Sequence, residues 1–228
     1  MNLALLLLGL LYLAPTPAKA LPPSPEETLC RLLWLPQTPK NARAPFLSQA
    51  EDLATLGQPR QAAENLDQGL ADLLATLKTA FSAEATTWKQ GRRALDQELS
   101  PTGPAALRGD LFTLKPWALA RAQKVYCLAG TQAQAFQLSD AALRDWGTRE
   151  HLVNRLLLTL RFGRLDEAER LAPAAPTGYR ETAAAAWLQC LRGHRTEALA
   201  QDLYRAARLC GDDRTRQGLE LMEEKCRP

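Results

Sequence analysis

This 228-residue sequence has few residues that could act in catalysis, and their spacing matches no catalytic motif. The histidines are His151 and His194. His151 has no second histidine four residues further on, so a helical zinc-binding pair is not indicated. His194 follows Gly193 in an expected turn, where we interpret it as a solvated side chain. Without a positioned imidazole, a serine or cysteine nucleophile would need another base.

Two pairs of neighbouring carboxylates, Asp166 with Glu167 and Asp212 with Asp213, could in principle do acid–base chemistry. However, the first pair falls in the first turn of an expected helix, where acidic side chains complement the helix dipole. The second pair precedes the last expected helix and favours a cap there. Neither a nucleophile-elbow motif, a glycine-rich phosphate loop nor an EF-hand pattern occurs. We therefore predict a protein that is not an enzyme, with no cofactor and no metal.

Composition and charge are those of an ordinary globular chain. Hydrophobic residues make up 46% and charged residues 23%, which is enough for one domain with a core. The net charge is only +3, and the charges are interspersed. Nucleic-acid binding and attraction to an anionic membrane surface are therefore not expected.

The first 20 residues have the layout of a secretory signal peptide. An apolar run from Leu3 to Ala14 is followed by the small-x-small site Ala18-Lys19-Ala20, and the run is too short to span a bilayer. An uncleaved hydrophobic anchor or a buried N-terminal helix is the alternative. We expect an exported bacterial protein, periplasmic or secreted, that meets the membrane only through the signal peptide before cleavage. Export also permits disulfides.

The elements after residue 20 are predicted to be helices. Ser24-Pro25-Glu26-Glu27 combines a cap, a first-turn proline and a capping box, which predicts a short N-terminal helix within a segment 21–44 that ends in a linker. From residue 45 to residue 228, apolar residues recur at intervals of three and four, as at Leu152, Leu156 and Leu160. Isoleucine is absent and valine occurs only twice, so no strand is indicated. The predicted fold class is all-α.

A glycine five residues before an alanine recurs along the chain. The pairs are Gly57 and Ala62, Gly130 and Ala135, Gly163 and Ala168, and Gly193 and Ala198. Glycine ends a helix in a left-handed conformation without a Cβ clash, and alanine lets the next helix cross close to the first. A spacing near 34 residues between some of these glycines is typical of helical hairpins stacked in an α-solenoid, the architecture of repeats of this length.

The stretch Gly163-Arg-Leu-Asp-Glu-Ala168, preceded by Leu152, Leu156 and Leu160, resembles a tetratricopeptide repeat (TPR). The aromatic near the repeat start and the closing proline are mostly missing. The resemblance implies an α-α superhelix of TPR-like hairpins over residues 45–228, and a non-repetitive helical bundle is the alternative.

TPR proteins commonly hold peptides in a concave groove lined by the first helix of each hairpin. Matching positions by their offset from each glycine places five residues in such a groove, namely Trp117, Lys124, Arg161, Arg180 and Trp187. Aromatic rings and cations on one face suit an extended segment with acidic groups. The alternative is that the tryptophans pack in the core and the cations form a solvated face.

The expected function is a non-catalytic scaffold of the cell envelope that binds a protein or peptide partner. The alternatives are a helical-bundle enzyme or small-ligand carrier with a carboxylate-based site, and a structural subunit whose groove is filled by its own chain.

If the repeats stack in register, Cys190 and Cys226 lie on neighbouring helices at similar height. A disulfide between them would hold the last helix. The alternative is that they are small buried core residues. The total of five cysteines is odd, so at least one has no intramolecular partner.

Overall fold

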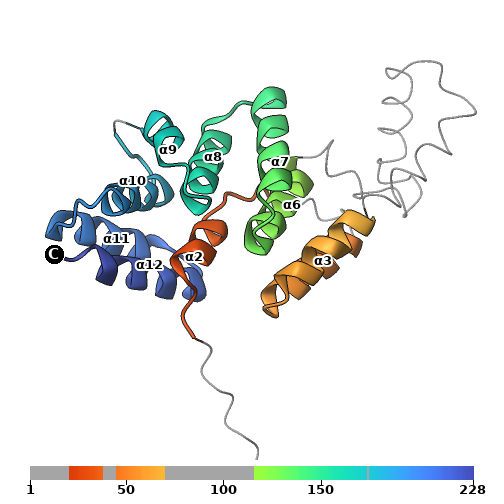
Figure 1. Ribbon diagram of the computed structural model, residues 1–228, viewed down its shortest axis with the longest axis horizontal. Coiled ribbons are helices and arrows are strands. Elements are labelled where there is room, and N and C mark those ends of the chain that lie inside the picture. Colours follow the sequence, from red (N-terminus) through yellow and green to blue (C-terminus); the bar gives the residue numbers. More distant parts are fainter. Residues whose placement is uncertain (1–20, 38–44, 70–115, 174) are drawn as a thin grey trace, which may run out of the picture.

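The computed structural model describes residues 21–37, 45–69, 116–173 and 175–228, and these residues form helices and no strands (Figure 1). The all-α prediction is therefore confirmed. The predicted signal peptide, residues 1–20, lies outside the described residues. The helices are α2 (Pro25–Arg31), α3 (Pro45–Thr55), α6 (Pro116–Ala129), α7 (Gln132–Asp145), α8 (Arg149–Arg161), α9 (Leu165–Leu171), α10 (Tyr179–Leu191), α11 (Glu197–Leu209) and α12 (Asp213–Cys226), and residues 59–69 are also helical.

The first and last of these helices begin at the caps that the sequence predicts. Ser24 precedes α2, and its hydroxyl accepts a hydrogen bond from the Glu27 amide at 3.2 Å. Asp212 precedes α12, and its carboxylate accepts one from the Thr215 amide at 2.8 Å. Each cap satisfies a backbone donor that has no partner inside the helix. Asp212 therefore has a structural role, as expected.

The recurring glycines end the first helix of each hairpin. Gly163 has a φ of +70°, a backbone conformation that residues with a Cβ rarely adopt. Its amide bonds the Leu160 carbonyl, and the following Arg164 amide bonds the Thr159 carbonyl, which together form a Schellman turn. Gly57, Gly130 and Gly193 have the same left-handed conformation and the same two hydrogen bonds. The same spacing thus produces the same turn at each position.

The predicted close crossings are present at Ala62, Ala135 and Ala168, whose side chains are fully buried. The prediction for Ala198 is wrong, because Ala198 is exposed and Ala200 takes the buried position. The reason is the turn length. Helix α9 begins two residues after its glycine, whereas α11 begins four residues after Gly193. Ala168 and Ala200 are each the fourth residue of their helix, so the crossing depends on the helix start and not on the distance from the glycine.

Consecutive helices pack as pairs, α6 with α7, α8 with α9, and α10 with α11 (Figure 1). Helix α12 packs on α10 and α11, and α3 packs on α6. Buried side chains from all these pairs form a continuous hydrophobic core. Helix α2 stands apart from this order, since it contacts α6, α8 and α12.

Two disulfides join elements that are distant in sequence. Cys190 is bonded to Cys226, which ties α10 to α12, the pairing that the repeat spacing favours. Cys30 is bonded to Cys127, which ties α2 to α6. Neither spacing nor repeat position indicated that second pair. Cys210 is a free, buried thiol.

Candidate functional site

Several long-range contacts within the described residues surround α2. We call the surfaces of α6, α8 and α12 that contact it the cradle. In Figure 1, α2 (orange-red) lies between α8 and α12. Leu29, Leu32 and Leu33 of this segment are between 1% and 4% exposed. Thr28 and Cys30 are fully buried beside them, so the short helix is covered on more than one side.

The segment that follows α2 is held through its backbone. The Asn154 side-chain oxygen accepts a hydrogen bond from the Trp34 amide at 2.6 Å, and the Asn154 nitrogen donates to the Trp34 carbonyl at 3.1 Å. The same nitrogen lies 3.4 Å from the side-chain oxygen of Gln123 on α6. One asparagine therefore satisfies both backbone groups of Trp34. Cys30 is bonded to the C-terminal part of α6, whereas Trp34 reaches the middle of α6 and α8, so this segment runs antiparallel to both helices.

His151 lies buried between two tryptophan rings. Its ring meets Trp34 edge-on with centroids 5.5 Å apart and stacks on Trp146 at 5.7 Å. Its Nδ1 is 3.0 Å from the Thr148 hydroxyl oxygen, and its Nε2 is buried without a hydrogen-bond partner. Burial lowers the pKa of His151 below its ordinary value, although Glu150 acts in the opposite direction. The neutral imidazole thus belongs to the packing around Trp34.

Helices α2 and α12 cross at a glycine. A Cβ built on Gly218 would come within 1.9 Å of the Thr28 hydroxyl oxygen and 2.9 Å of Cγ of Pro23. The Thr28 hydroxyl donates to the Ser24 carbonyl at 2.8 Å. Glu27 of α2 also accepts a hydrogen bond from Arg214 of α12 at 3.3 Å. The cradle is therefore shaped to the side chains of Thr28 and Pro23, and the sequence offered no sign of this role for Gly218.

The predicted groove tryptophans do not line a groove. Trp117 is 5% exposed and Trp187 is 7% exposed, and both belong to the hydrophobic core. The prediction that they bind a partner is wrong, because burial of a large indole ring in the core removes it from the surface. Both tryptophans instead pack in the hydrophobic core, which was the alternative interpretation.

The three predicted groove cations, Lys124, Arg161 and Arg180, are half-buried and have no ion-pair or hydrogen-bond partner among the residues that the structure describes. They do not share one hollow. Lys124 lines a hollow of about 270 Å³ with Arg31, Glu51 and Asp52. Its pKa is lowered, chiefly by burial and then by nearby Arg31.

Arg180 lines a smaller hollow, of about 170 Å³, between the N-terminal ends of α8 and α10. Glu181 in this hollow already accepts two hydrogen bonds from Arg149, at 2.6 and 2.8 Å, and one from the Thr177 amide. Arg161 lies elsewhere, at the end of α8, with its guanidinium 5.3 Å from the centroid of the Phe162 ring. The three cations are therefore not one continuous binding surface.

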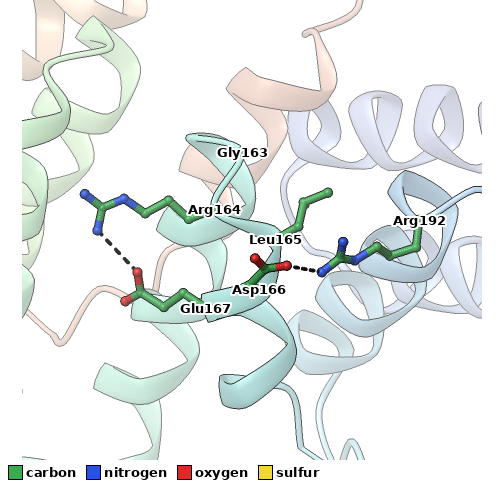
Figure 2. A pocket seen from close by; sticks show the side chains of 6 residues that line it. All are labelled: Gly163, Arg164, Leu165, Asp166, Glu167 and Arg192. Carbon is green, nitrogen blue, oxygen red and sulfur yellow. Dashed lines mark hydrogen bonds and ion pairs between the residues drawn. The ribbon is translucent and has the colours of Figure 1, made fainter.

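The acidic pair Asp166 and Glu167 lies beside an open hollow of about 560 Å³ (Figure 2). Figure 2 shows that the two carboxylates face different arginines. Asp166 accepts from Arg192 at 2.6 Å. Glu167 accepts from Arg155 of α8 at 2.8 Å and pairs with the neighbouring Arg164 at 3.2 Å. The hydrogen bond from Arg192 lowers the pKa of Asp166. The two groups form separate ion pairs between helices and not an acid–base pair.

Within the described ranges, no group of three or more His, Cys, Asp or Glu side chains is arranged to hold a metal ion. No helix in the same part of the chain is long and apolar enough to cross a membrane. Comparison with protein-family models, with curated proteins and with solved structures found no match.

Proposed function

We propose that this protein is a non-catalytic scaffold of the cell envelope, built as a superhelix of TPR-like hairpins. It binds a protein or peptide partner by contacting acidic groups of that partner. Support for the hairpins comes from four turns with the same backbone conformation and hydrogen bonds. Each turn is followed by a buried alanine at the fourth residue of the next helix. Stacked units of this kind leave surfaces along their length on which partners bind.

The proposal that the partner is acidic rests on a difference between the half-buried cations that form ion pairs and those that do not. Most of them pair with a carboxylate, namely Arg31, Arg121, Arg155, Arg214 and Arg216. Lys124, Arg161 and Arg180 make no such pair within the described structure, and acidic groups act on them only from beyond ion-pair distance. A charge that is partly removed from water loses hydration free energy unless an opposite charge compensates it. A carboxylate of a partner would supply that compensation.

Arg180 is the sharpest place to test this interpretation. It stands in a hollow where the oxygens of Glu181 are already occupied by Arg149 and Thr177. Glu150 lies near enough for Arg180 to help lower its pKa, after the larger effects of hydrogen bonds from its own backbone amide and from Thr148. An incoming carboxylate would meet Arg180 at the edge of this hollow.

The experiment is a quantitative pull-down from envelope extract with the mature chain, Arg180→Glu and Arg161→Glu. Arg195→Glu is the matched control, because Arg195 is exposed and makes no ion pair in the described structure. Reversal of a contacting charge should reduce capture of a specific partner by about tenfold or more, and the control should retain it. Equal capture by all four proteins would refute the role of the half-buried cations.

A further inference from the structure

We propose that residues 21–35 act as an intramolecular ligand of the cradle, and that the partner fitting this surface is a short amphipathic helix with the same pattern as α2. Opening of the Cys30–Cys127 bond releases the intramolecular ligand. The inference rests on the proposed binding role, but it concerns a surface that does not depend on Arg180 or Lys124.

The contacts of α2 are those of a bound peptide. Its apolar anchors at Leu29, Leu32 and Leu33 have the spacing by which amphipathic helices enter a groove. Asn154 then binds both backbone groups of Trp34, a form of recognition that does not depend on the side chain of the bound residue. Gly218 removes the side chain that would otherwise occupy the path of the helix.

The charges at the ends of α2 match the cradle as well. Burial raises the pKa of Glu26, but hydrogen bonds from its own backbone amide and from Ser24, and attraction by Arg161 and Lys225, make the net shift downward. Arg161 is thus close to an acidic group supplied by the chain itself. The partner pattern that follows is a capping Ser or Thr, an acidic first turn, leucines at the three anchor positions and an extended C-terminal end.

The Cys30–Cys127 disulfide makes this occupancy permanent. Both cysteines are fully buried, and the bond closes a loop across 97 residues, so α2 stays at the cradle even when its other contacts open. A dithiol reductant would supply two electrons, each sulfur would gain a proton, and the reductant would become a disulfide. The helix would then exchange between bound and free states, and a partner helix would compete with it.

The first measurement is hydrogen exchange on full-length Cys30→Ser. The amides of Thr28 and Leu32, which are hydrogen-bonded within the α2 segment, should exchange at least about tenfold faster than in the wild type. The amides of α8 should stay protected. The matched control is Cys190→Ser, which breaks the other disulfide and should leave the α2 amides unchanged. Unchanged α2 exchange in Cys30→Ser would overturn the proposed release, as would equal loss of protection in α2 and α8.

The second measurement tests whether the cradle accepts a helix from another molecule. The full chain carrying Cys30→Ser and Leu29→Asp keeps Cys127 free and weakens its own α2. A synthetic peptide of residues 21–35 is added with oxidised glutathione, which accepts the two electrons as the peptide thiol and Cys127 join. The native peptide should cross-link to Cys127 about tenfold faster, or more, than the same peptide with Leu29→Asp, as expected from one buried leucine anchor.

Equal rates for the two peptides, or no cross-linking, would overturn the inference. Circular dichroism checks that the full-chain variant is folded, and the exchange measurement tests the inference independently if it is not. Neither measurement involves Arg180 or an envelope partner. A failure here with successful Arg180-dependent capture would therefore reject the cradle ligand and leave the proposed function standing.

Discussion

The crossing of α2 and α12 at Gly218 gives the most direct test of the cradle. In Gly218→Ala, the new methyl group would lie 1.9 Å from the Thr28 hydroxyl oxygen and 3.0 Å from the Thr28 Cβ. Gly218 and Thr28 are both buried, so the methyl group has no solvent-filled space to enter. Either α2 moves away from α12 or Thr28 gives up its hydrogen bond to the Ser24 carbonyl.

Two opposing effects set the size of the change. Overpacking of a buried contact costs about 1–3 kcal/mol. Replacement of glycine by alanine inside a helix stabilises it by about 1 kcal/mol. The net loss should therefore be at most about 2 kcal/mol. At about 2–4 °C per kcal/mol for a chain of this size, the melting temperature should fall by up to several degrees. If α2 moves away from α12, trypsin should also cut more readily after the half-buried Arg31.

Thermal melts and limited proteolysis measure these effects. Gln217→Ala is the control, because its side chain is exposed in the same helix. The double variant Gly218→Ala with Thr28→Ala removes the hydroxyl that the methyl group meets, so its loss of stability should be smaller than the sum of the two single losses. A melting temperature of Gly218→Ala equal to or above that of the wild type, with Arg31 still protected from trypsin, would show that the two helices do not cross tightly here.

Other predictions concern a crossing, a titration and a cap. Ala168→Leu should lower the unfolding free energy in urea by about 1–3 kcal/mol because its site is fully buried, whereas exposed Ala198→Leu should change it by less than about 0.5; similar losses would contradict the assigned crossing. Burial lowers the pKa of His151 below 6.5, so the unfolded chain binds more protons and the unfolding free energy should fall as pH drops from about 7 to 5. The urea midpoint should fall with decreasing pH in His194→Asn but much less in His151→Asn. An equal dependence on pH in the two variants would contradict the role of His151. Asp212→Ala should cost about 1 kcal/mol through loss of the α12 cap, measured by the same titration, and no loss would remove the cap from the argument.

Local chemistry made part of the fold predictable from the sequence. A serine or aspartate cap needs only the amide three residues further on, so Ser24 and Asp212 identify their helix starts without knowledge of the rest of the molecule. A left-handed glycine likewise ends a helix through hydrogen bonds within six residues. The Ala198 error shows the limit, because two additional turn residues after Gly193 moved the crossing to Ala200.

The candidate site was less predictable because it depends on which helix faces rest against each other. A fixed offset from the glycines selected Trp117 and Trp187 as surface residues, yet both faces are covered in the core. The same offset selected Arg180 and Lys124, which are partly exposed and make no ion pair with another described residue. Offsets within one hairpin therefore identify a side of the helix, but they do not say what lies against it.

The position of α2 explains why the repeat pattern failed where it did. A repeat argument treats each hairpin as contacting only the next one. The segment 21–35 instead comes from outside the hairpins. Its partners Cys127, Asn154 and Gly218 lie on three different helices far away in sequence. No periodicity connects those three residues, and each has a common role elsewhere, as a core thiol, a polar helix residue or a weak helix former. Their shared role becomes visible only once the N-terminal segment is placed among them.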